Sequence, residues 1–140
     1  MFFQGERLNS IDIKCVVDDI FGTDVHEKRK KSIANAALGV INSASLIVYR
    51  IGLGLAAAND LFGKYAVKQV DRLLSNDKFS PWDYFAHYAP YIVGARKEIV
   101  VAMDWTDFDG DQQATLTMSL VTKHGRATPL IWTCLSGKYL

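Results

Sequence analysis

The spacing of apolar residues changes along this 140-residue chain, and the change divides it into two parts. Up to about residue 97, apolar residues recur every three to four positions, which is typical of helices with one buried face. From residue 98 onwards, short apolar runs rich in β-branched residues alternate with polar turns, as in antiparallel strands. The pattern predicts an α+β chain with its helices first and its strands last.

The helical part begins with a short helix over 11–21 that ends at Gly22. Asp24 is predicted to cap the next helix, which runs from 28 to about 58 and can break at Asn42-Ser43, with Ser43 capping the second half. Small residues are frequent in this segment, so neighbouring helices can approach closely. Its apolar face is predicted to consist of Ile33, Ala37, Val40, Ala44, Ile47, Ile51 and Leu55.

A further amphipathic helix is predicted over 65–74, after a turn at Gly63, and it has a line of cations on one face. Lys64, Lys68 and Arg72 recur at four-residue steps, with Gln69 beside them. Cations can reach phosphates and a glutamine can read an adenine edge, so the arrangement suits a DNA recognition helix. The open alternative is an ordinary solvated face. The inward residues are predicted to be Val67, Val70, Leu73 and Leu74.

A second group of cations stands at the start of the 28–58 segment. Cations oppose the helix macrodipole at this end, which favours a role in binding phosphates over a plain solvated first turn, although both remain open. The group consists of Lys28, Arg29, Lys30 and Lys31.

One more helix is predicted between the two parts of the chain. Ser80 is expected to cap it, Pro81 to take its first position, and Gly94 to end it. Phe85 belongs to its apolar stripe, whereas Tyr88 is expected on the outer side.

The carboxy-terminal part predicts a three-stranded antiparallel meander with strands near 99–104, 114–121 and 127–135. The Asp109-Gly110 pair indicates a hairpin turn, and 123–126 form another turn. Because the first strand is apolar on both sides, helices are expected to cover both faces. Asp104 would then lie at the exposed end of the first strand.

A carboxylate at the end of a rigid strand could hold a hard cation such as Mg²⁺. The alternative is that the acids here only satisfy backbone N–H groups of the turn. These acids are Asp104, Asp107, Asp109 and Asp111.

The composition gives the chain almost no net charge. Forty-nine per cent of the residues are apolar, and 16 basic against 15 acidic side chains give a net charge of +1, so no global field draws the chain to nucleic acid. Cys15 and Cys134 lack metal or disulfide spacing, which indicates a reducing, cytoplasmic location, and both are expected to be buried. The uncharged stretch 32–49 contains amides and hydroxyls that are costly in lipid, so no membrane span is expected.

Three segments of the chain stand out as motifs: Ala102-Met-Asp-Trp-Thr-Asp-Phe-Asp109, Leu116-x-x-Ser-Leu-Val-Thr-x-His-Gly-Arg-Ala-Thr-Pro-Leu130 and, upstream, Val70-Asp-Arg-Leu-Leu-Ser-Asn76. Together they resemble the DDE transposases of the fourth insertion-sequence family. The resemblance implies a ribonuclease-H-like catalytic domain in which two Asp and one Glu bind two magnesium ions, with Asp104 as the first acid. It also implies that the preceding helical region engages the terminal inverted repeats of the element.

The expected organisation is therefore a helical DNA-binding region over 1–78, a connecting helix over 79–97 and a partial ribonuclease-H-like domain over 98–140. No Asp or Glu follows Asp111, so the second Asp and the Glu are missing, and Mg²⁺ binding is expected to be weak or absent. We expect a truncated transposase that binds element ends without strand transfer. A second copy of the transposase or the missing catalytic portion are further expected partners.

Parts of the sequence also suit two other classes of protein. A non-catalytic interaction protein that modulates full-length transposase remains open. Asp107-Phe-Asp109-Gly110 is also similar to the motif of haloacid-dehalogenase phosphatases, which use the first Asp as nucleophile and the second as general acid. Asp111 stands where that motif has Thr or Val, and a hairpin is predicted instead of a helix, so this class is disfavoured.

Overall fold

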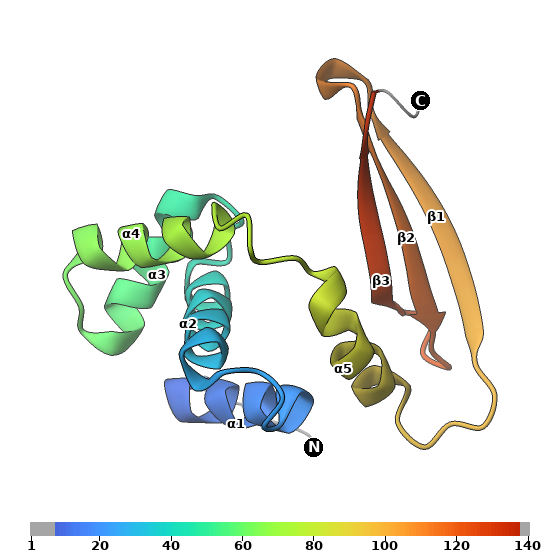
Figure 1. Cartoon of the computed structure of the whole chain (residues 1–140), viewed down its shortest axis with the longest axis horizontal. Helices are drawn as coiled ribbons and strands as arrows, with labels where there is room; N and C mark the ends of the chain where they lie inside the picture. The colour runs from blue at the N-terminus through green and yellow to red at the C-terminus, as the bar shows by residue number, and fades with distance from the viewer. Residues whose placement is uncertain (1–7, 138–140) are drawn as a thin grey trace. The chain divides into compact units, whose positions relative to one another are not determined.

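The computed structural model of the chain describes residues 8–137 and contains five α-helices followed by three antiparallel strands in an open sheet (Figure 1). The predicted regions 1–78 and 98–140 include residues 1–7 and 138–140, which lie outside the described residues. The chain divides into two compact units, with the boundary after Ser80. We call residues 8–80 the helical unit and residues 81–137 the sheet unit.

Helix α1 (Ser10–Phe21) and helix α2 (Glu27–Ser43) begin with side-chain caps. The Asn9 carboxamide oxygen accepts from the backbone N–H groups of Ile11 and Asp12, and the Asp12 carboxylate accepts from the Asn9 N–H, which forms a capping box. His26, not the predicted Asp24, caps α2, because its Nδ1 accepts from the Lys28 N–H at 3.2 Å. Gly22 ends α1 with φ of 53°, as predicted.

The long helical segment is two helices, α2 and α3 (Val48–Asn59), bent by 96° at the break between them. Ala44 ends α2 in the left-handed conformation, and the Ser45 hydroxyl, rather than Ser43, accepts from the backbone of Ile47 at the turn into α3. Within the described residues no single helix is long and apolar enough to cross a membrane; α2 and α3 meet that criterion only jointly.

The bend also overturns the predicted single apolar stripe. The stripe was predicted for one straight helix. Because α2 and α3 are bent by 96°, the residues of that stripe cannot all face the same core. Ala44 and Ile47 are exposed, and the α2 residues that become buried include Ala34 and Leu38 instead of Ile33 and Ala37. In α3, Ile51 and Leu55 are buried as predicted.

Glycines allow α2, α3 and α4 (Gly63–Leu74) to pack with their backbones in contact. A Cβ at Gly52 would collide with the backbone of Val67 on α4, and a Cβ at Gly54 would collide with the carbonyl of Gly39 on α2. The predicted close approach of helices is therefore confirmed. Against this contact α4 buries Ala66, Val70 and Leu73, whereas Leu74, predicted to face inward, is exposed.

In the sheet unit, helix α5 (Trp82–Val93) begins at Trp82 with Pro81 as its N-cap, and no side chain caps it. The predicted cap at Ser80 is therefore wrong, whereas Gly94 ends the helix as predicted, with φ of 60°. The helix packs against strand β3: the ring centroids of Phe85 and Trp132 are 4.7 Å apart. Tyr88 also faces Trp132, at 6.4 Å, rather than the outer side, and burial raises the pKa of its hydroxyl.

The predicted meander is confirmed, with strand order β1-β2-β3. The strands are β1 (Val100–Phe108), β2 (Gln113–Val121) and β3 (Ala127–Ser136), and the short 3-10 helix η1 (Asp109–Asp111) forms the first hairpin turn. Strand β1 is longer than predicted because β2 pairs with it as far as Phe108. Asp104, opposite Thr117, consequently lies in the middle of the strand and not at its end.

The register gives the sheet one mainly polar and one mainly apolar face. Asp104 shares its face with Thr117, its cross-strand partner, and with Thr106, whose hydroxyl donates to the Asp104 carboxylate at 3.0 Å. The opposite face contains Val101 and Met103, and Val101 lines an apolar hollow of about 470 Å³ together with residues of α5. The expectation of two apolar faces is met by β1, whose Val100 and Ala102 share the Asp104 face, but not by β2, which presents Thr and Ser there.

The two cysteines are exposed, not buried as predicted. The Thr115 hydroxyl and the Cys134 sulfur, on neighbouring strands, lie 3.7 Å apart on the polar face.

Candidate nucleic-acid interface

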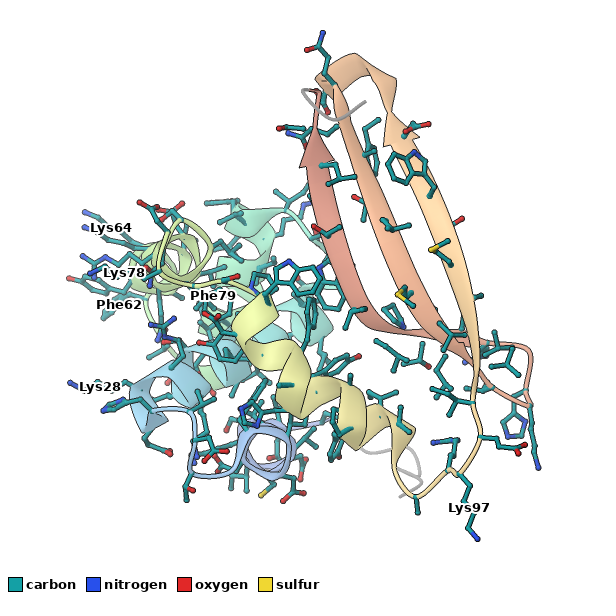
Figure 2. The ribbon with its side chains drawn as sticks, turned by 45° about the vertical axis from the view of Figure 1, so that its right-hand side comes forward. Lys28, Phe62, Lys64, Lys78, Phe79 and Lys97 are labelled. Carbon is teal, nitrogen blue, oxygen red and sulfur yellow. The ribbon has the colours of Figure 1, made fainter. Side chains whose placement is uncertain are left out.

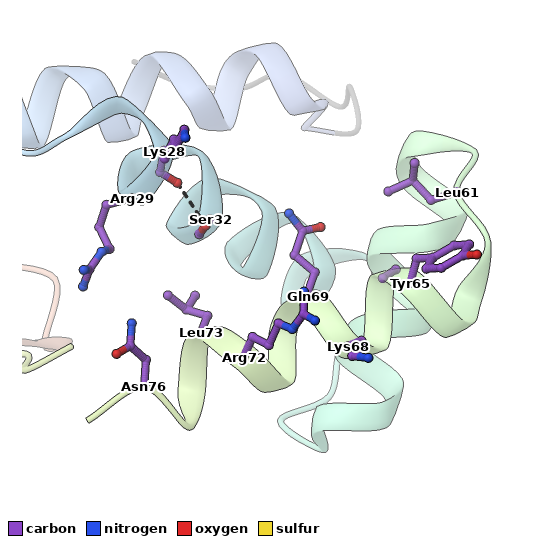
Figure 3. Close-up of a pocket in the computed structure, with 11 residues that line it drawn as sticks. Lys28, Arg29, Ser32, Leu61, Tyr65, Lys68, Gln69, Arg72, Leu73 and Asn76 are labelled. Atoms are coloured by element: carbon purple, nitrogen blue, oxygen red, sulfur yellow. Dashed lines mark hydrogen bonds between the residues drawn. The ribbon is translucent and has the colours of Figure 1, made fainter. Parts of the chain in front are cut away.

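Several of the side chains predicted to bind DNA line a groove between the start of α2 and the length of α4 (Figure 3). The groove has a volume of about 600 Å³. Four cations line it, and no Asp or Glu is among its lining residues. These cations are Lys28, Arg29, Lys68 and Arg72.

Helix α4 contributes one side of this groove as a helical stripe. Tyr65, Gln69 and Arg72 recur at steps of three or four residues, so they lie along one side of the helix, and Asn76 follows just beyond its end. Ala66, Val70 and Leu73 hold the adjoining side of α4 in the core, which fixes the direction of the stripe. Figure 3 shows Gln69 extending toward α2 across the groove.

The first turns of α2 form the opposite side. Arg29 is the most constrained cation there: its guanidinium lies 5.5 Å from the ring centroid of Phe79, in the range of a cation–π contact. A turn in which the Asn76 carboxamide accepts from the Lys78 N–H holds the chain that leads to Phe79. The contact therefore joins the start of α2 to the segment that follows α4.

Three of the predicted DNA-binding cations lie outside the lining of the groove. Lys64 and Lys31 are exposed, and Figure 2 shows Lys64 pointing away from the helices into solvent. Lys30 is different, because its side chain is buried against α1. The sequence grouped Lys30 with its neighbours, but a helical step of about 100° per residue turns it to the other side of α2.

Lys30 belongs to a four-membered ion-pair cluster that joins α1 to α2. Its ammonium lies 2.9 Å from Asp18 and 3.0 Å from Glu27, and it donates to the Gly22 carbonyl at 2.9 Å. Lys14 pairs with the same two carboxylates, at 2.7 and 2.9 Å. Hydrogen bonds from Lys14 and then Lys30 lower the pKa of both carboxylates, and the carboxylates raise the pKa of both ammonium groups.

This cluster should make the stability of the helical unit depend on pH. The pKa values of Asp18 and Glu27 are lowered in the folded chain. The two carboxylates therefore contribute fully to its stability above their ordinary pKa values of 3.8 and 4.5, and this contribution is lost as the pH falls through the lowered values. The pKa values of Lys14 and Lys30 are raised in the folded chain. Their contribution to stability is therefore complete below the ordinary pKa of 10.5 and is lost as the pH rises through the raised values.

We expect the Lys30→Met variant to lose part of the acid-dependent change in the free energy of unfolding, since the carboxylates keep only Lys14. Urea unfolding of both proteins at a series of pH values between acid and neutral measures the difference. Lys31→Met removes an exposed cation from the next position and should leave the pH profile unchanged. Parallel profiles for the wild type and Lys30→Met would contradict the assignment.

Asp104 lies far along the sequence from the groove, on the polar face of the sheet unit, and its side chain is exposed. Among the described residues no group of three or more His, Cys, Asp or Glu could hold a metal ion. Asp107 lies on the opposite face of β1 from Asp104 and accepts a hydrogen bond from the Trp105 indole at 2.6 Å.

The sequence reasoning missed three of the groove's polar or aromatic lining residues and its cation–π contact. Tyr65 could have been found, because it continues the helical spacing of Gln69 and Arg72, whereas Asn76 lies beyond the end of α4. Ser32 follows Lys28 by one turn, and its hydroxyl donates to the Lys28 carbonyl at 3.0 Å. The contact of Arg29 with Phe79 spans fifty residues and has no signal in local spacing.

Comparisons of the chain with protein-family models, with curated proteins and with solved structures find no match.

Proposed function

We propose that this chain binds duplex DNA through the groove between α2 and α4. The observation on which the proposal depends is the convergence of four cations and Gln69 from two helices on one concave surface whose lining has no acid. Cations in such a surface contact phosphates, and a glutamine projecting between them is suited to an adenine edge. Helix α3, the three-residue turn 60–62 and helix α4 form a helix-turn-helix arrangement with α4 in the place of the recognition helix.

The DNA is proposed to be the terminal inverted repeats of an insertion sequence, bound in the cytoplasm. The resemblance of segments 70–76, 102–109 and 116–130 to transposases supports this assignment, and so does a carboxy-terminal sheet of three antiparallel strands. In this proposal the sheet unit is the start of a ribonuclease-H-like domain, and Asp104 is the first of the three acids of its two-magnesium site. The mid-strand position of Asp104 weakens the argument that a strand end presents it to a metal.

The chain should bind element-end DNA without cutting it, because a two-metal site needs acids from separate elements and no Asp or Glu follows Asp111. Gel shift and strand-cleavage assays on the same labelled duplex, with Mg²⁺ present, measure both properties. Asp104→Ala should leave the binding constant within about twofold of the wild-type value, because a single exposed carboxylate outside the groove contributes little. Cleavage that disappears in Asp104→Ala would contradict the proposal.

A second candidate function is association with a full-length transposase or another copy of the chain. It is favoured by apolar side chains on one face of β1: Met103 is 70% exposed and Trp105 is 46% exposed. Exposed apolar residues gathered on one strand are typical of interaction surfaces. Light scattering of the chain with and without a full-length relative distinguishes this candidate from the DNA-only function.

A further inference from the structure

Two aromatic side chains at the start of α4 are exposed although nothing in the fold requires them there. Phe62 is 80% exposed and Tyr65 is 69% exposed. Their ring centroids lie 6.2 Å apart with an interplanar angle of 81°, an edge-to-face pair that holds one ring against the other. The pair therefore forms a small aromatic surface that is open to solvent.

The position of Phe62 adds an independent argument. Phe62 is the N-cap residue of α4, and no side chain caps this helix. Ser, Thr, Asp or Asn at this position would stabilise the helix, whereas an exposed phenylalanine neither caps it nor packs into the core. A stability argument alone does not account for this residue.

The charges around the pair complement a nucleic acid. Tyr65 lines the groove together with Lys68, Gln69 and Arg72, and Lys64 separates the two aromatic residues in sequence. Figure 2 shows Phe62 and Lys64 both directed outward from the helical unit. Asp60, in the turn before the pair, is the acid nearest to Phe62 in sequence.

We infer that Phe62 and Tyr65 form a stacking surface for an unpaired base of DNA whose backbone lies in the groove. The inference rests on the proposed function. Every base has an apolar face that stacks on an aromatic ring, and cations beside the ring hold the flanking phosphates. The chain then prefers a duplex that contains an unstacked nucleotide, such as one at a kink or a frayed end, over the same duplex fully paired.

The test compares two DNA probes of the same mixed sequence, one fully paired and one with a single unpaired adenine. Fluorescence anisotropy titrations of the full chain should give a dissociation constant roughly tenfold lower for the probe with the unpaired base. Phe62→Ala should remove this preference while the affinity for the paired probe stays unchanged. Phe62→Trp should retain the preference, and Phe62→Leu, which is apolar but cannot stack, should lose it.

Leu46→Ala is the matched control, because Leu46 is 84% exposed in the turn before α3 and does not line the groove. It should behave as the wild type with both probes. Equal affinities of the wild type for the two probes, or a preference that persists in Phe62→Ala, would overturn the inference and leave groove binding intact. If the paired probe binds without dependence on Lys68 and Arg72, the proposed function itself fails and the inference fails with it.

Discussion

Replacing both Lys68 and Arg72 by alanine is expected to weaken binding of duplex DNA by roughly 50- to 100-fold at about 0.1 M salt. Both side chains line the groove from α4, one turn apart. Each phosphate contact releases about 0.9 of a counterion, so the loss of one contact costs roughly tenfold at this ionic strength. The slope of the logarithm of the binding constant against the logarithm of salt concentration should fall by about two units.

Arg50→Ala provides the control for this experiment. Arg50 is an exposed cation on α3 that does not line the groove, so its removal changes the net charge with little effect on the contact surface. Its affinity and salt slope should remain close to those of the wild type. The single variants Lys68→Ala and Arg72→Ala are compared with it. If Arg50→Ala weakens binding as much as either of them, binding depends on overall charge, and the groove is not the interface.

Substitution of Gly52 by alanine should destabilise the helical unit by about 1–3 kcal/mol. In an exposed helix the same change stabilises by about 1 kcal/mol, because alanine has the higher helix propensity. Here the added methyl group would overlap the backbone of Val67, and a backbone cannot rotate aside as a side-chain tip can. Urea unfolding monitored by circular dichroism measures the free energy of unfolding.

Gly63→Ala makes the same chemical change at the first residue of α4, where the new Cβ would lie 3.1 Å from the end of the Leu53 side chain. This contact can relax, so the variant should unfold within about 1 kcal/mol of the wild type. Equal stability of the two variants would show that α3 and α4 are not in backbone contact.

Local sequence signals predicted the elements well where one residue determines the backbone. Gly22 and Gly94 end α1 and α5 with positive φ, which glycine adopts without steric cost. The alternation of apolar runs and turns likewise predicted all three strands and their order. By contrast, the length of β1 depends on its pairing with β2 as far as Phe108. Polar residues such as Asp107 made the sequence predict an earlier end of this strand.

The candidate interface could be predicted in part. The spacing of Lys68, Gln69 and Arg72 follows from helical geometry, so one side of the groove is visible in the sequence. Lys28 and Arg29 were also predicted to bind phosphates, but their convergence with α4 on one groove was not, because it depends on the 96° bend after α2 and on the packing of α3 on α4. The inward turn of Lys30 was likewise hidden, since its partners Asp18 and Glu27 come from two helices.

The outer edge of β1 has a consequence for handling the protein. Strand β1 is at the end of the strand order, so within the described residues alternate peptide groups from Val100 to Phe108 have no neighbouring strand on that side. Their amide protons should exchange with deuterium faster than those that β2 protects. Concentrated solutions should favour edge-to-edge growth of the sheet, and only Asp104 and Asp107 place negative charge along β1 to oppose it.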